Sequence, residues 1–224
     1  MRKGLTEVVF ILDRSGSMRG LESDTIGGFN SLIDKQKKEE GEAIISTVLF
    51  DDYSEVLYDR VDVRKIEAMN EKQYYVRGCT ALLDAIGDAI HHIAMVHKYA
   101  REEDRPEKTL FIITTDGMEN ASSRYSYNEI RKMVEKEQDK YGWEFLFLGA
   151  NIDAINIAGR VGIKANRAVD YECDSRGTRL QYAVLTETIS KVRRSKLESA
   201  KAAMETEDDW CEDLRADYKS RHGK

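Results

Sequence analysis

Three residues with oxygen-bearing side chains occupy alternate positions immediately after the first apolar stretch of the chain. Residues 8–12 are apolar, and Asp13, Ser15 and Ser17 follow them. A carboxylate and two hydroxyls are oxygen ligands of the kind that Mg²⁺ and Ca²⁺ prefer. Buried parallel strands read as apolar runs, and their ligands collect beyond the carboxyl ends of the strands. This pattern predicts a cation-binding loop, with Arg14 on the opposite side of the extended backbone, at the rim of the site.

Two further loops carry side chains of the same kind next to predicted elements. Thr80 precedes a strongly apolar helix, and Asp116 with Gly117 directly follows an apolar strand. Together with the first loop, they supply two carboxylates and three hydroxyls. Mg²⁺ takes about six oxygen ligands at roughly 2.0–2.1 Å, keeps several waters and uses few carboxylates. Because hydroxyl ligands add no charge, such a site stays electrophilic enough to accept a carboxylate from outside.

The elements that must position these loops alternate between apolar strands and amphipathic helices. We expect strands at residues 8–12, 43–50, 55–58, 109–115, 143–148 and 165–171, with 55–58 at an edge of the sheet. We expect helices at residues 23–40, 82–94, 127–140, 151–160 and 177–203, and one helical turn within 64–69. This alternation predicts an α/β fold, a three-layer α/β/α sandwich.

Length and composition fit a single globular domain. The chain of 224 residues allows one well-buried core, and its 41% of hydrophobic residues excludes a chain that is disordered throughout. We expect one domain over residues 1–203 and a charge-dense tail over residues 204–224. The tail is either a weakly docked helical end or a partner-binding segment anchored by Trp210.

Charge and cysteine usage argue against several classes of protein. The net charge of −6 leaves no global electrostatic footprint for nucleic acid or anionic lipid. Cys79, Cys173 and Cys211 contain no C-x-x-C pair, which argues against a disulfide framework and a zinc site. No segment approaches the roughly 18 consecutive apolar residues of a membrane span, and the N-terminal pattern lacks a signal-peptide cleavage site. We therefore expect a cytoplasmic protein that binds neither nucleic acid nor membrane.

The five oxygen-bearing residues resemble the metal-ion-dependent adhesion site of von Willebrand factor A domains. They match that site in type and order: Asp13, Ser15, Ser17, Thr80 and Asp116. The resemblance extends to the local patterns at residues 50–51, 78–82 and 113–117 and covers roughly residues 6–194. Because neither disulfides nor a secretion signal is evident, the chain is most similar to stand-alone cytoplasmic members of bacterial or phage type.

The resemblance implies a doubly wound, mostly parallel sheet with one antiparallel edge strand and a divalent cation at its top. That cation is most often Mg²⁺, with Mn²⁺ or Ca²⁺ as alternatives. By carry-over, Ser15, Ser17 and Thr80 are hydroxyl ligands, while Asp13 and Asp116 bind directly or through water. Members of the family usually bind a protein partner whose Asp or Glu often completes the metal shell, and they are not characteristically enzymes.

One enzymatic alternative fits the residues superficially. In a Mg²⁺-dependent phosphotransferase or phosphatase of the haloacid dehalogenase type, Asp13 would be the nucleophile and the Asp116 segment would help to hold the metal. That chemistry normally needs a second acid two residues after the nucleophile, as general acid and base. Ser15 occupies this position and is not an acid at neutral pH. The sequence therefore favours a metal-dependent interaction module over an enzyme.

Overall fold

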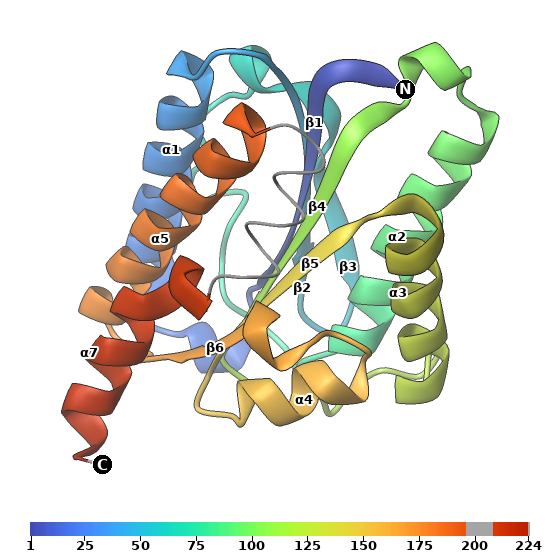
Figure 1. Cartoon of the computed structure of the whole chain (residues 1–224). Coiled ribbons are helices and arrows are strands. Elements are labelled where there is room, and N and C mark those ends of the chain that lie inside the picture. The colour runs from blue at the N-terminus through green and yellow to red at the C-terminus, as the bar shows by residue number, and fades with distance from the viewer. Residues whose placement is uncertain (196–207, 224) are drawn as a thin grey trace.

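Six strands form a single sheet in the computed structural model, which describes residues 1–195 and 208–223 (Figure 1). The strands are β1 (Arg2–Asp13), β2 (Glu42–Phe50), β3 (Ser54–Asp62), β4 (Pro106–Thr115), β5 (Glu144–Ala150) and β6 (Ala168–Tyr171). Their spatial order is β3-β2-β1-β4-β5-β6. All neighbouring pairs are parallel except β2 with β3, which is antiparallel. This arrangement confirms the expected doubly wound sheet with one antiparallel edge strand.

Helices cover both faces of the sheet and complete a three-layer sandwich (Figure 1). They are α1 (Glu22–Lys38), α2 (Leu82–Tyr99), α3 (Tyr127–Tyr141), α4 (Ala154–Arg160), α5 (Ser175–Arg194) and α7 (Glu212–His222). Side chains of α1, α5 and α7 share one core with the sheet, and those of α2, α3 and α4 share the other. Among the described residues, no helix is long and apolar enough to cross a membrane.

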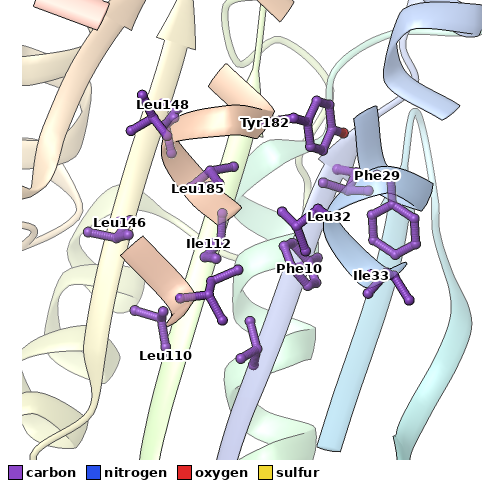
Figure 2. Packing of buried hydrophobic residues seen from close by; sticks show 14 of the residues in the cluster. Phe10, Phe29, Leu32, Ile33, Leu110, Ile112, Leu146, Leu148, Tyr182 and Leu185 are labelled. Carbon is purple, nitrogen blue, oxygen red and sulfur yellow. The ribbon is translucent and has the colours of Figure 1, made fainter. Parts of the chain in front are cut away.

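Strand β1 lies in the middle of the sheet and is buried on both sides. Successive side chains of a strand point to opposite faces, and Phe10 accordingly belongs to one core and Ile11 to the other. Phe10 packs edge-on against Phe29 of α1, with ring centroids 5.4 Å apart (Figure 2). Full burial of each such side chain contributes about 1.5–3 kcal/mol. This packing holds β1 between the two helical layers.

The register of the strands brings three loops to one edge of the sheet. Asp13 at the end of β1 is paired with Phe50 at the end of β2. On the other side, Leu12 is paired with Thr114 near the end of β4. Since these strands are parallel, the segments that follow them leave the sheet at the same edge.

Several elements differ from their expected ranges; β1 begins at Arg2 instead of residue 8, and α2 continues to Tyr99 instead of residue 94. The edge strand β3 is longer than residues 55–58, and β6 begins only at Ala168 because Ala165–Arg167 form a 3₁₀ turn. The helical turn expected within residues 64–69 lies at Val63–Lys65. Most side chains of β3 are exposed or half-buried. An edge strand of this kind carries little apolar alternation, which explains why the sequence indicates only its middle.

Helix α5 ends at Arg194, although the sequence pattern extends the helix over residues 177–203. Lys108 of β4 is buried, and its Nζ donates to the carbonyl oxygens of Val192 at 2.8 Å and Arg193 at 3.1 Å. Carbonyls of the last helical turn lack partners within the helix, so a cation at this place caps its end. Ser195 has extended backbone, and residues 196–203 of the expected helix lie outside the described residues.

The described part of the expected tail is a helix that packs on β6 and α5. Leu214 is buried in the core beneath it. The indole Nε1 of Trp210 donates to the carbonyl oxygen of Asn166 at 2.7 Å, and Arg176 of α5 forms a salt bridge of 2.7 Å with Asp217. Trp210 therefore anchors the tail to its own chain. The expected boundary between residues 203 and 204 lies outside the described residues.

Candidate metal site

The structure brings the five predicted residues together beyond the ends of β1 and β4. The hydroxyl of Thr80 donates to Ser15 Oγ at 3.0 Å, and Ser15 Oγ lies 3.0 Å from Ser17 Oγ. The hydroxyl of Ser17 donates to Asp116 Oδ1. Asp13 Oδ1 accepts the backbone N–H of Ser15 at 2.7 Å. The five side chains thus form one continuous polar group drawn from three separate loops.

The first loop is held in a tight turn by the same residues. Ser15 has extended backbone, and Gly16–Met18 form a 3₁₀ turn whose Met18 side chain is buried. An aspartate that accepts a backbone N–H two residues ahead stabilises such turns. The N–H of Gly16 also donates to the carbonyl of Gly78 at 3.1 Å. These bonds seat the first loop against the loop that carries Thr80.

The backbone of Gly117 lies close to two of the hydroxyls. A Cβ atom at this position would lie 3.0 Å from Ser17 Oγ and 3.0 Å from Thr80 Oγ1. Any side chain here would therefore crowd both hydroxyls. Ser15 and Thr80 are buried, whereas Ser17 is exposed, so the group of five side chains reaches solvent at Ser17.

The two carboxylates of the group are buried without a compensating charge. Both Asp13 and Asp116 are 1% exposed, and neither forms a salt bridge within the part of the chain that the structure describes. Burial raises the pKa of Asp13 to about 6, against the lowering effect of hydrogen bonds from Thr115 and Ser15 and with a further rise from the charge of Asp116. Burial also raises the pKa of Asp116, against hydrogen bonds from Ser17 and Cys173.

This group of oxygen-bearing side chains is suited to bind a small divalent cation. Two carboxylates and three hydroxyls offer the oxygen ligands that Mg²⁺ prefers, and the group reaches solvent at Ser17. Two like charges in a buried site are costly unless a cation offsets them. Within the described residues, no cluster of three or more His, Cys, Asp or Glu side chains forms an alternative metal site.

The prediction for Arg14 was wrong, because its side chain is fully buried instead of lying at the rim. Its Nε donates to Asp51 Oδ2 at 2.8 Å, and its Nη2 donates to Glu55 Oε2 at 2.8 Å. Nε of Arg77 reaches the same Asp51 oxygen at 2.7 Å. Burial alone would raise the pKa of Asp51, but hydrogen bonds from Arg77, Tyr53 and Arg14 hold it below its ordinary value. The β2–β3 hairpin supplies the acids that allow this arginine to be buried.

Three residues that the sequence analysis missed also contact the site. Thr115 Oγ1 donates to Asp13 Oδ2 at 2.6 Å, and the Tyr74 hydroxyl donates to the Asp13 carbonyl at 2.6 Å. The Cys173 thiol donates to Asp116 Oδ2 at 3.3 Å, and burial raises its pKa to about 12. Thr115 adjoins Asp116 in the sequence, so its position next to the site could have been predicted. Nothing in the sequence pattern around Tyr74 and Cys173 indicates their contacts.

Comparison with known proteins identifies the fold. No protein-family model and no curated protein matches the sequence. Among solved structures, the vWF domain of the type V pili tip protein Mfa5 from Porphyromonas gingivalis is 11% identical, with a TM-score of 0.60, and the match covers 85% of this chain and 97% of that chain. The von Willebrand factor type A structure from Catenulispora acidiphila is 13% identical, with a TM-score of 0.53, covering 82% of this chain and 42% of that chain.

Proximal thread matrix protein 1 from the mussel byssus has the same fold. Its structure with a zinc-occupied metal-ion-dependent adhesion site is 17% identical, with a TM-score of 0.53, and the match covers 90% of this chain and 46% of that chain. This chain thus spans less than half the length of two of these three structures. At such identities the likeness establishes architecture. The chain has the fold of a von Willebrand factor A domain.

Proposed function

We propose that this chain binds a protein partner through a divalent cation held by Asp13, Ser15, Ser17, Thr80 and Asp116. The observation that carries the proposal is a pair of buried carboxylates that lie beside three hydroxyls and form no salt bridge with any residue that the structure describes. Mg²⁺ is the first candidate, and Mn²⁺ and Ca²⁺ accept the same class of oxygen ligand. The zinc that proximal thread matrix protein 1 holds at its adhesion site supports a divalent cation here.

The chain's own residues shape the site before any partner arrives. The hydroxyl oxygens of Ser15, Ser17 and Thr80 add no charge to the site. Asp116 joins them through its Oδ1 atom, which accepts a hydrogen bond from the Ser17 hydroxyl. Asp13 is oriented through both oxygens, by the Ser15 N–H and by Thr115. When bound, the cation supplies an open coordination position for an Asp or Glu of the partner.

The surface around the site favours a protein as that partner. Tyr53, Tyr75 and Met118 lie on loops at this edge and are 76%, 41% and 70% exposed. The guanidinium of Arg77 stacks over the ring of Tyr75, with its central carbon 5.1 Å from the ring centre. Exposed tyrosine, methionine and arginine are enriched at the centres of protein interfaces. They provide contacts beyond a single metal-bound carboxylate.

The proposed setting is a reducing one, the cytoplasm. Cys79 is exposed, Cys173 is half-buried and Cys211 is buried, and the three form no disulfide with one another. Persistent disulfides are typical of secreted proteins, whereas separate thiols suit a compartment that keeps them reduced. We extend the proposal accordingly to a cytoplasmic module, and the resemblance noted in the sequence favours one of bacterial or phage type.

Catalysis is the weaker alternative for the same residues. A phosphotransferase that used Asp13 as nucleophile would need an acid at position 15, where the chain has the Ser15 hydroxyl in contact with Ser17 and Thr80. We expect no turnover of a broad panel of phosphate esters in the presence of Mg²⁺. Turnover that requires Mg²⁺ and disappears in Asp13→Asn would establish the enzymatic alternative instead.

A pull-down with and without EDTA tests the proposal. Immobilised wild-type protein should retain a specific protein in Mg²⁺ and release it in EDTA, and Asp13→Ala should retain none. Glu135→Gln, which removes a surface acid paired with Arg131 on α3, is the matched control and should behave like wild type. Equal retention by wild type in EDTA and by Asp13→Ala would rule out a metal-mediated contact.

A further inference from the structure

Helix α2 begins without a cap of its own. Its N-cap residue, Ala81, makes no side-chain hydrogen bond, although the first amides of a helix need acceptors from outside it. The loop after Asp116 supplies them. The N–H of Leu83 donates to Glu119 Oε2 at 2.9 Å, and the N–H of Asp84 donates to Ser122 Oγ at 3.0 Å.

The bonds between this loop and α2 run in both directions. The carboxylate of Asp84 accepts the N–H groups of Ser123 at 3.1 Å and of Arg124 and Tyr125 at 3.0 Å each. Burial of Asp84 alone would raise its pKa, but these bonds and the charge of Arg124 hold the pKa below its ordinary value. The Asp116 loop and the start of α2 therefore form one hydrogen-bonded unit.

Asn120 makes the bond nearest to the candidate site. The N–H of Thr80 donates to Asn120 Oδ1 at 2.9 Å, and the N–H of Asn120 donates back to the Thr80 carbonyl at 3.1 Å. Thr80 is held by Asn120 on its backbone and meets Ser15 through its hydroxyl at 3.0 Å. Because the backbone decides which side-chain rotamers are allowed, the bonds to Asn120 restrict where the Thr80 hydroxyl can point.

We infer that Asn120 is a positioning residue of the metal site, which ties the Asp116 loop to Thr80 so that both present their oxygens together. This inference rests on the proposed function, since it concerns the same site. Asn120 lies in the loop that Asp116 opens, and both of its hydrogen bonds to Thr80 are to backbone atoms, so its action on a cation is indirect. Residues that orient metal ligands in this way typically change metal affinity by about 10–100-fold when removed.

Two variants separate the hydrogen bond from the bulk of the residue. Asn120→Ala removes the acceptor of the Thr80 N–H, whereas Asn120→Asp keeps an oxygen at the same place. The matched control is Ser126→Ala, which removes the capping box at the start of α3, where Ser126 and Glu129 bond each other reciprocally. That change weakens a helix start of the same kind without contacting Thr80.

Hydrogen exchange in the metal-free protein gives the first readout. We expect the Thr80 amide to exchange about tenfold faster in Asn120→Ala than in wild type, and at the wild-type rate in Asn120→Asp and Ser126→Ala. Equal exchange in Asn120→Ala and wild type would show that Asn120 does not hold Thr80. That result overturns the inference irrespective of any metal.

Titration with Mn²⁺ gives the second readout. Affinity should fall at least about tenfold in Asn120→Ala and stay at or above the wild-type value in Asn120→Asp and Ser126→Ala. A wild-type affinity in Asn120→Ala, or an equal fall in Ser126→Ala, overturns the positioning role while leaving the proposed function standing. If wild type binds no Mn²⁺ or Mg²⁺, the proposed function fails and the positioning role fails with it.

Discussion

Two aspartates at the same edge of the sheet lie in opposite electrostatic surroundings. Asp13 ends β1, Asp51 follows the neighbouring β2, and both are 1% exposed. Asp51 accepts from Arg14 at 2.8 Å and from Arg77 at 2.7 Å, and its pKa lies below the ordinary value. Asp13 accepts hydrogen bonds from Ser15 and Thr115 but forms no ion pair with any residue that the structure describes, and burial raises its pKa to about 6.

The difference shows how the chain neutralises one buried carboxylate with its own residues and leaves another without a counter-charge. We call the Asp51 group, with Arg14 and Arg77, the closed site, and the group around Asp13 and Asp116 the open site. At Asp51 the chain supplies two guanidiniums, one of them fully buried. At Asp13 the adjacent arginine, Arg14, turns to Asp51 and leaves Asp13 with Asp116 as its charged neighbour. Buried charges persist in proteins when they are paired or when they coordinate metals. Asp51 illustrates the first case, and we propose the second for Asp13.

The largest expected effect on stability comes from a substitution in the closed site, at Asp51. Asp51→Asn leaves the half-exposed Glu55 as the one carboxylate in contact with the buried Arg14 among the described residues, and breaking a buried pair in this way costs about 3–5 kcal/mol. The free energy of unfolding in urea should fall by this amount with the slope of the transition unchanged. A loss below about 1 kcal/mol would mean that the buried pair is not a major source of stability.

The equivalent substitution at the open site, Asp13→Asn, should raise the free energy of unfolding instead of lowering it. Burial lifts the pKa of Asp13 from 3.8 to about 6, so its charge disfavours folding at pH 7 by roughly 3 kcal/mol. In EDTA, Asp13→Asn should therefore be more stable than wild type by up to about that amount. A destabilisation like that of Asp51→Asn would show that Asp13 is compensated within the chain.

Added Mg²⁺ should stabilise only proteins with an intact open site. Binding to the folded state raises the free energy of unfolding by about 2.7 kcal/mol when the ligand is present at 100 times its dissociation constant. We expect such a rise in urea unfolding for wild type and for Asp51→Asn, and none for Asp13→Asn. A rise of equal size in all three would place the cation elsewhere.

The smallest expected effect is on the pH dependence of stability. Because the pKa of Asp51 in the folded state lies below its ordinary value of 3.8, its charge stabilises the fold fully above 3.8, and this stabilisation is lost as the pH falls through the lowered pKa. The stability gap between wild type and Asp51→Asn should therefore shrink below pH 3.8. Urea titrations from neutral pH downwards measure this, and a gap that widens in acid would contradict it.

The sequence was informative where a single residue type ends a buried run. Aspartates directly after apolar strands indicate where β1 and β4 stop, and parallel pairing then brings their loops together. Arg14 could not be placed in this way. Its acceptors, Asp51 and Glu55, are 37 and 41 positions away and meet it only once β2 and β3 pair. An arginine is fully buried only when paired, so its burial depended on contacts that no local pattern encodes.

The role of Asn120 was equally hidden, for a related reason. Its side chain caps a backbone N–H that is 40 positions away, at the start of a helix whose own N-cap is an alanine. The sequence places Thr80 before the helix but not the residue that holds it. Within the candidate site, residue types in the sequence indicated the oxygen-bearing side chains. Only the fold shows which neighbouring residues orient them.

Calorimetric titration of Mg²⁺ and Mn²⁺ into wild type, Asp13→Ala and Asp51→Asn tests the central claim most directly. We expect one cation to bind per chain in wild type and in Asp51→Asn, under conditions where that variant remains folded, and none to bind in Asp13→Ala. Equal binding by wild type and Asp13→Ala, or no binding by wild type, would contradict the assignment of the open carboxylates to a divalent cation.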